Sequence, residues 1–260
     1  MKQSRWDLLL VLVTVGQVVL LLAPFFLAVP PVLRTGLVIV NAFLVGMNYQ
    51  CVAHNFIHHP FFTNNGLNEV FSVLNSLAIG LPQSAYRLHH LNHHRYNNDP
   101  AKDESSTWRF AKNQREENIF SYSLLGLLRT DLMGLIRAAG RTSALVYAEL
   151  AVLIFVLLGA GLLRPGLFLS YLLPSLLLGQ VFALWENYCE HRGADYRDRQ
   201  RDSVSCYNGF YNWIWFNNGY HQEHHFRPQV HWTEIRPVRA ELPNDRVVVH
   251  GCHLTNSFHH

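Results

Sequence analysis

Four long stretches of the chain are apolar and almost free of charge. They cover about residues 8–29, 35–53, 142–163 and 165–189. The acids Glu149 and Glu186 are their only charged residues. Each stretch is close to the roughly 20 residues that a helix needs to cross a bilayer, and four such runs favour membrane spans over buried helices of a soluble core. We therefore predict an all-α integral membrane protein with four transmembrane helices in two hairpins.

The segments outside these spans are polar and carry most of the basic residues. They comprise residues 54–141 and 190–260, and we expect them to form a helical cap, so that residues 1–260 make one membrane domain. All but two of the 21 Lys and Arg residues lie in these segments or at the N-terminus. Because cytoplasmic loops of membrane proteins carry an excess of positive charge, we predict that the cap and both termini are cytoplasmic.

Composition agrees with this picture and limits the partners. The chain is 49% hydrophobic and 15% charged, whereas soluble domains are about 25% charged. The net charge of +3 calls for no nucleic-acid partner. A mildly basic cytoplasmic face instead suits contact with anionic lipid headgroups.

Eleven of the 16 histidines fall into four short clusters outside the apolar stretches. The clusters are His54-x-x-x-His58-His59, His89-His90-x-x-His93-His94, Asn187-x-x-x-His191 and His221-x-x-His224-His225. Spacings of three and four residues place imidazoles on one face of a helix. Two histidines four apart can share one metal ion, and a histidine at the third position can reach a second ion. The pattern H-x-x-H-H, which occurs twice, therefore predicts a helix face that bridges two metals.

Nine histidines are candidate ligands of such a centre. They are His54, His58, His90, His93, His94, His191, His221, His224 and His225. Imidazole binds iron, zinc, copper or nickel, so the residues alone do not select the metal. Soluble helical di-iron proteins use Glu and Glu-x-x-His ligands, but the spans here offer almost no acids. The ligand set is therefore expected to be imidazole.

The order of the clusters and the four spans resembles the membrane fatty acid desaturase superfamily, which also contains hydroxylases. Its H-x(3–4)-H box resembles residues 54–58, and its two H-x(2–3)-H-H boxes resemble residues 90–94 and 221–225. We call these segments box one, box two and box three. The segment Asn187-x-x-x-His191 is similar to a further element at the end of the fourth span of that family. The resemblance covers most of residues 40–235, and the text around box two is similar to bacterial desaturases.

The resemblance implies a membrane di-iron oxidoreductase. It would use two iron ions (Fe2+/Fe3+) and dioxygen to introduce a double bond into the acyl chain of an acyl-lipid or acyl-thioester. In the acyl-CoA branch, the residue that matches His191 is an iron ligand and the residue that matches Asn187 holds a water on the other iron. No side chain beyond the metal centre is then needed for catalysis. A bacterial protein of this kind would lie in the inner membrane.

The given sequence contains nothing that resembles a cytochrome, a ferredoxin or a flavin or nicotinamide fingerprint. We therefore expect an external electron donor, either a ferredoxin, a rubredoxin or a b-type cytochrome with its reductase. The basic cytoplasmic face would attract an acidic carrier.

Several polar residues depart from the family pattern or lie near it. His59 and His89 are one position off the ligand face, so we expect them beside the ligands or in solvent rather than on a metal. Histidines outside the clusters are expected to be solvated; they are His231, His250, His253, His259 and His260. Ligating imidazoles need an acceptor for their second nitrogen. The candidates are Asp99, which we favour because it follows box two closely, and Asp103, Glu104, Glu186, Glu190 and Asp202.

Two other functions compete with desaturation. A di-iron hydroxylase of a lipid or another apolar molecule would have the same boxes, because the outcome depends on how the substrate lies. A metal transporter places its ligands near the middle of the bilayer. Here the histidines lie beyond the ends of the spans, which argues against transport.

Overall fold

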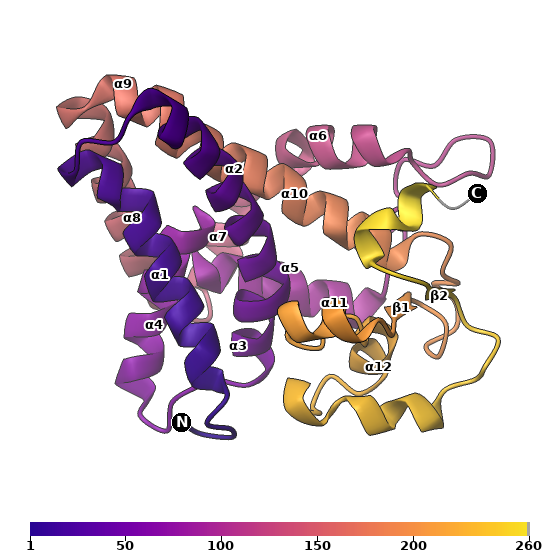
Figure 1. Ribbon diagram of the computed structural model, residues 1–260. Helices are drawn as coiled ribbons and strands as arrows, with labels where there is room; N and C mark the ends of the chain where they lie inside the picture. The colour runs from indigo at the N-terminus through magenta and orange to yellow at the C-terminus, as the bar shows by residue number, and fades with distance from the viewer. Residues whose placement is uncertain (259–260) are drawn as a thin grey trace. The chain divides into compact units, whose positions relative to one another are not determined.

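The computed structural model describes residues 1–258 (Figure 1). The chain is mostly helical and divides into two compact units. The first unit comprises residues 1–56, 60–88 and 131–183, and the second comprises residues 57–59, 89–130 and the described chain from 184 onward. Helices α3, α5 and α10 each begin in the first unit and end in the second. The single membrane domain over residues 1–260 stays a prediction.

The first unit is built from helices throughout. Its elements are α1 (Asp7–Phe26), α2 (Pro31–Met47), the π-helical turn η1 (Asn48–Ala53), α4 (Asn65–Ile79), α7 (Leu132–Gly140), α8 (Leu145–Leu163), α9 (Pro165–Leu167) and η2 (Phe168–Leu172). The three helices that continue into the second unit are α3 (His54–His58), α5 (Gln83–Tyr96) and α10 (Leu173–His191). Helix α4 packs against both α1 and α8.

Within residues 1–258, four helical segments are each long and apolar enough to cross a membrane. They run over Asp7–Phe26, Pro31–His58, Leu145–Leu163 and Pro165–His191. These four candidate spans agree with the expected ones, with shifted ends, whereas their pairing in hairpins and the cytoplasmic cap stay predictions. The second segment continues past the expected end at residue 53 and reaches box one through the π-helical turn η1. Such turns are rare and are frequently found at functional sites.

The surface of these helices suits a lipid environment. In α8 the side chains of Phe155, Leu162 and Leu163 are each about 80% exposed. A helix that is apolar on all sides and exposes large side chains would be insoluble in water, but it is stable in hydrocarbon. With the four apolar segments, this surface indicates a membrane protein.

The one acid of α8 has a structural explanation. Glu149 is fully buried, and its carboxylate accepts hydrogen bonds from the Ser72 hydroxyl at 2.6 Å and from the Ser84 amide and hydroxyl at 2.9 and 2.8 Å. Ser84 lies in the first turn of α5, where backbone N–H groups lack helical partners. Glu149 therefore anchors the start of the helix that carries box two.

The second unit contains short elements joined by ordered loops. They are α6 (Ile119–Arg129), β1 (Ser205–Cys206), α11 (Gly209–Ile214), α12 (His221–Phe226), η3 (Trp232–Glu234), η4 (Arg236–Glu241), β2 (Val248–Val249) and η5 (His253–Phe258). Strands β1 and β2 pair in parallel, with Ser205 opposite Val248 and Cys206 opposite Val249. Box three forms α12, which packs against β1 and η4.

Candidate metal centre

Eight of the nine candidate histidines lie in the second unit and form two groups. In the first group, the ring nitrogens of His58, His90, His94 and His224 lie within 4.8 Å of one another. The Nε2 atoms of His58 and His90 are 3.0 Å apart, and those of His94 and His224 are 3.1 Å apart. Three separate segments of the chain thus bring their imidazoles to one point.

The second group is built in the same way and is more deeply buried. It contains His93, His191, His221 and His225, each at most 3% exposed. The Nε2 atom of His191 lies 3.0 Å from that of His93 and 3.2 Å from that of His221. Nitrogens bound to one first-row metal at about 2.1 Å are about 3.0 to 3.4 Å apart, so these separations fit a shared ion.

Helical spacing explains how each box divides between the groups. In box two, His90 and His94 are four residues apart and share the first group, while His93 points to the second. In box three, His221 and His225 share the second group, while His224 belongs to the first. Each H-x-x-H-H helix thus contributes to both groups, as the spacing predicts.

The ninth histidine, His54, belongs to the first unit. It lies one helical turn before His58 on α3, and its Nδ1 is 3.0 Å from the backbone oxygen of Gln50. This bond places the proton on Nδ1 and leaves the lone pair on Nε2.

Two histidines of the second group are oriented in the same manner by acceptors on Nδ1. His93 Nδ1 lies 2.7 Å from the carboxylate of Asp103, and His191 Nδ1 lies 3.1 Å from the backbone oxygen of Asp202. A bound acceptor on Nδ1 fixes the tautomer that directs the Nε2 lone pair into the group. Asp103 is itself held by the Ser105 amide and hydroxyl at 2.9 and 2.7 Å.

The sequence-based choice of Asp99 as this acceptor is wrong. The Asp99 side chain accepts a bond from the Ala101 amide and lies 4.0 Å from Lys102. Asn97 and Asn98 adopt left-handed backbone angles, with φ of 45° and 65°, which turns the chain after α5. This turn places the more distant Asp103 against His93.

The protonation states suit metal binding. Burial, followed by the neighbouring imidazoles of His225 and His90, lowers the pKa of His94 well below its usual value. Burial, with His221 and His191 nearby, does the same to the pKa of His225. Both rings are therefore neutral at pH 7, which is the form that binds a metal.

The ring nitrogens of His225 provide a further test of whether these residues fit a metal ion. Its ring is fully buried, and among residues 1–258 neither nitrogen has a hydrogen-bond partner. Its Nδ1 lies 3.9 Å from the Asp202 carboxylate. A buried polar group without a partner costs about 1–3 kcal/mol, which a metal ion on the ring would offset. The donor set, its spacing and this orphaned ring all fit a metal.

Asn187 lies one helical turn before His191 on α10, and its side chain is held by two polar residues. Its amide nitrogen donates to the Tyr122 hydroxyl at 2.6 Å, and Tyr122 in turn donates to the Ser105 backbone oxygen at 2.7 Å. The Ser105 hydroxyl is also 3.2 Å from His93 Nδ1. Neither Tyr122 nor Ser105 is signalled by the sequence pattern, because single Tyr and Ser residues are common in loops and helices.

The extra histidines of boxes one and two lie outside both groups. The His59 ring is buried beside His231, with ring centres 5.3 Å apart. His89 is partly exposed, and its Nδ1 lies 3.9 Å from Glu104. That neither residue is a metal ligand stays a prediction.

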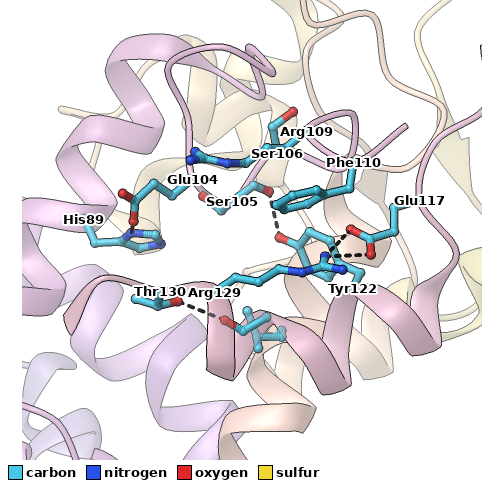
Figure 2. Close-up of a pocket in the computed structure, with 12 residues that line it drawn as sticks. His89, Glu104, Ser105, Ser106, Arg109, Phe110, Glu117, Tyr122, Arg129 and Thr130 are labelled. Carbon is cyan, nitrogen blue, oxygen red and sulfur yellow. Dashed lines mark hydrogen bonds and ion pairs between the residues drawn. The ribbon is translucent and has the colours of Figure 1, made fainter. Parts of the chain in front are cut away.

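His89 and Glu104 line a small cavity of about 40 Å³, shown in Figure 2. Its opposite wall holds Arg129, which pairs with Glu117 at 2.7 Å and lies over the Phe110 ring at 4.0 Å. A space of this size holds only a few water molecules. The cavity is too small to be the lipid site.

The expectation that the remaining histidines are solvated is partly wrong. His231 is 8% exposed and His253 is fully buried, whereas His250 is exposed as expected. His259 and His260 lie outside the described residues. The burial of the His253 imidazole therefore needs an explanation, either in packing or in chemistry.

Comparison with known proteins identifies the family. The model of the fatty acid desaturase family matches residues 27–250. The sphingolipid delta(4)-desaturase/C4-monooxygenase DES2 of Mus musculus is 30% identical over 205 residues, which cover 73% of this chain and 60% of that protein. The DES2 protein of Rattus norvegicus is 31% identical over 192 residues, with 68% and 55% covered. The chain thus matches about 60% or less of the length of these curated relatives. Because the family model matches most of its length, this chain belongs to the fatty acid desaturase family.

Proposed function

We propose that this chain is a membrane enzyme that uses dioxygen and two iron ions to desaturate the acyl chain of a lipid. The observation that carries the proposal is the convergence of box two, box three and the ends of the second and fourth spans into two histidine groups. Family membership selects iron and dioxygen from the metals and reactions that imidazole allows.

The residues have distinct roles in this proposal. One iron would be held by His58, His90, His94 and His224 and the other by His93, His191, His221 and His225, with His54 as the ninth ligand. Asn187 would hold a water on the iron that His191 does not bind. Tyr122 fixes the Asn187 amide, and Asp103 keeps His93 in the required tautomer. With two irons bound, the site supplies an oxidant able to remove hydrogen from an unactivated methylene.

The apolar helices provide the surroundings for such a substrate. The lipid reaches the site from the bilayer, and electrons come from a separate carrier on the basic cytoplasmic side, which can be a ferredoxin, a rubredoxin or a b-type cytochrome. The protein's contribution is to hold the metals and to place one methylene beside them.

Hydroxylation of a lipid is the second candidate, and a specific observation favours it. The matched relatives are named as both desaturase and C4-monooxygenase, so one family member can bear both activities. Removal of a second hydrogen gives a double bond, whereas transfer of oxygen gives an alcohol. Metal transport gains no support from the family.

Mass spectrometry of total lipids separates these outcomes. The chain is expressed in a host beside the His93→Ala variant, with a compatible reductase and carrier supplied. The proposal expects products that lack two hydrogens in the wild type only. Products that gain one oxygen instead would make the enzyme a hydroxylase. If the iron-loaded wild type and the His93→Ala variant give the same lipids, both desaturation and hydroxylation are contradicted.

A further inference from the structure

His225 of box three lacks a ring contact of the kind that orients other histidines of its group. His93 and His191 are each held through Nδ1, but neither nitrogen of the buried His225 ring has a hydrogen-bond partner among residues 1–258. The position of this ring therefore depends on the helix that carries it. That helix, α12, has only six residues, and its N-cap residue Tyr220 makes no side-chain capping bond. A helix of this length is unstable by itself and needs tertiary contacts.

The two residues between the histidines of box three supply such contacts. Gln222 and Glu223 are polar, but both are fully buried. The Glu223 carboxylate accepts hydrogen bonds from the Ser205 hydroxyl at 2.7 Å and from the Tyr207 hydroxyl at 2.6 Å. The Gln222 side chain accepts a bond from the Ser203 amide at 2.8 Å, and its backbone N–H donates to the Ser205 hydroxyl at 3.3 Å. Every one of these partners lies in strand β1 or within two residues of it.

The strand that holds these partners is itself fixed by its neighbours. Strand β1 pairs with β2, and α12 packs against β1 (Figure 1). The guanidinium of Arg246, which lies two residues before β2, is 3% exposed, donates to the Tyr207 hydroxyl and lies 3.5 Å from the Glu223 carboxylate. Hydrogen bonds to an ionised group are about twice as strong as neutral ones, so the bonds of Glu223 are the strongest link between α12 and β1.

We propose that Glu223 is a positioning residue of the metal centre, which anchors α12 to β1 and thereby places the histidines of box three. This inference rests on the proposed function, because it requires both groups to bind metal. Helix α12 supplies His221 and His225 to the second group and His224 to the first. A shift of α12 would therefore displace ligands of both ions at once. Metal sites tolerate displacements of only about 0.5 Å from their working geometry.

The test compares three substitutions in the full chain purified in detergent. Glu223→Gln keeps the size of the side chain, but it removes the charge that faces Arg246 and turns one acceptor into a donor. Tyr207→Phe removes one of the donors to the carboxylate, and Glu234→Gln changes an exposed acid of η3 as the matched control. Each protein is loaded anaerobically with Fe2+, and the loss of both ions to a chelator is followed for the folded fraction. Loading with Co2+ instead gives an absorption spectrum that reports on the ligand geometry.

We expect Glu223→Gln to weaken the retention of both ions by about 10-fold and to change the Co2+ spectrum. Tyr207→Phe should have a smaller effect of the same kind, and Glu234→Gln should behave as the wild type. Wild-type retention with an unchanged spectrum in Glu223→Gln would overturn the proposal, and so would the loss of a single ion. If the wild type itself binds no metal, the proposed function fails instead, so the two failures are distinguishable.

The double variant tests the route of the effect. If Tyr207 acts through Glu223, adding Tyr207→Phe to Glu223→Gln should cause little further loss, whereas independent effects would multiply and contradict the anchor. If Glu223→Gln fails to fold, Tyr207→Phe and Ser205→Ala replace it, because each removes only one oxygen that donates to the carboxylate. Wild-type retention and spectra in both of these variants would then overturn the proposal.

Discussion

Buried polar side chains occur in both units, but they are satisfied in different ways. In the first unit, the Thr14 hydroxyl donates to Asn75, the Asn75 amide donates to Gln83, and the Gln17 amide donates to the Ala78 backbone oxygen, at 2.8–2.9 Å. Both carboxylate oxygens of Glu149 are also bonded. These groups find their partners within the protein itself, although the side-chain oxygens of Asn41 and Asn48 have none among residues 1–258.

In the second unit, by contrast, the buried histidines turn their nitrogens toward one another. Both nitrogens of His225 and one oxygen each of Glu190 and Asp202 have no hydrogen-bond partner among residues 1–258. Natural proteins rarely leave buried polar atoms unpaired, so each case calls for a ligand, a water or a functional reason. The comparison teaches that the first network links helices to one another, whereas the second leaves unpaired nitrogen and oxygen atoms of the kind that can bind a metal.

The largest expected effect comes from removing an orphaned ligand. His225→Leu should reduce metal retention by more than about 100-fold, which exceeds the effect of a residue behind a ligand. The free energy of unfolding of the metal-free protein should stay the same or rise, because the change removes a buried group without partners. Chelator competition and denaturant titration of the same samples check both parts. A large loss of metal-free stability would contradict the distinction drawn between the units.

Glu149→Ala should give the opposite result. It leaves the donors of Ser72 and Ser84 unpaired in a buried site and should lower the free energy of unfolding by about 2–4 kcal/mol. Metal affinity of the fraction that remains folded should change little. Denaturant titration in detergent measures the first quantity, with the exposed Glu69→Ala as a matched control. Equal stability of the two variants would argue against the anchoring of α5.

A change behind a ligand should have an intermediate effect on the metal. Asp103→Asn keeps the shape of the side chain but removes the charge that fixes the His93 tautomer, so metal retention should fall about 10- to 100-fold. Although burial raises the pKa of Asp103, His93 and the Ser105 hydrogen bonds lower it further, so the group is ionised throughout the working range. Asp99→Asn is the matched control and should behave as the wild type.

The smallest effect is a pH dependence of the metal-free protein. Burial lowers the pKa of His253 to about 3 from an unfolded value near 6.5, so between these values the unfolded chain binds more protons. Stability should therefore fall as the pH falls below about 6.5, and His253 alone contributes about 2 kcal/mol of this loss at pH 5. Unfolding titrations of the wild type and His253→Asn from pH 8 to pH 5 measure the difference. Parallel curves would show that His253 has the same pKa in the folded and the unfolded chain.

The parts predictable from the sequence are those that local chemistry determines. Charge-free runs of about 20 residues predict the spans, because a bilayer demands them. The three- and four-residue spacing of the boxes predicts which histidines of each helix fall together, because helix geometry fixes it. The second span reaches His58 rather than residue 53 because the helix continues through the π-helical turn η1 into α3, although the residues of α3 are more polar.

The remaining features depend on tertiary structure. The turn at Asn97 and Asn98 decides that Asp103, not Asp99, meets His93. His253 is a lone histidine with no partner at helical spacing, and its burial arises from the docking of η5 on the end of α10. No periodicity in a single sequence reports such contacts between distant segments.

The central claim is that the two histidine groups together hold two metal ions. The most direct test is the iron content of the full chain, purified in detergent, loaded anaerobically with Fe2+ and freed of unbound metal. The account predicts two irons per chain. A folded protein that retains one iron or none would contradict it.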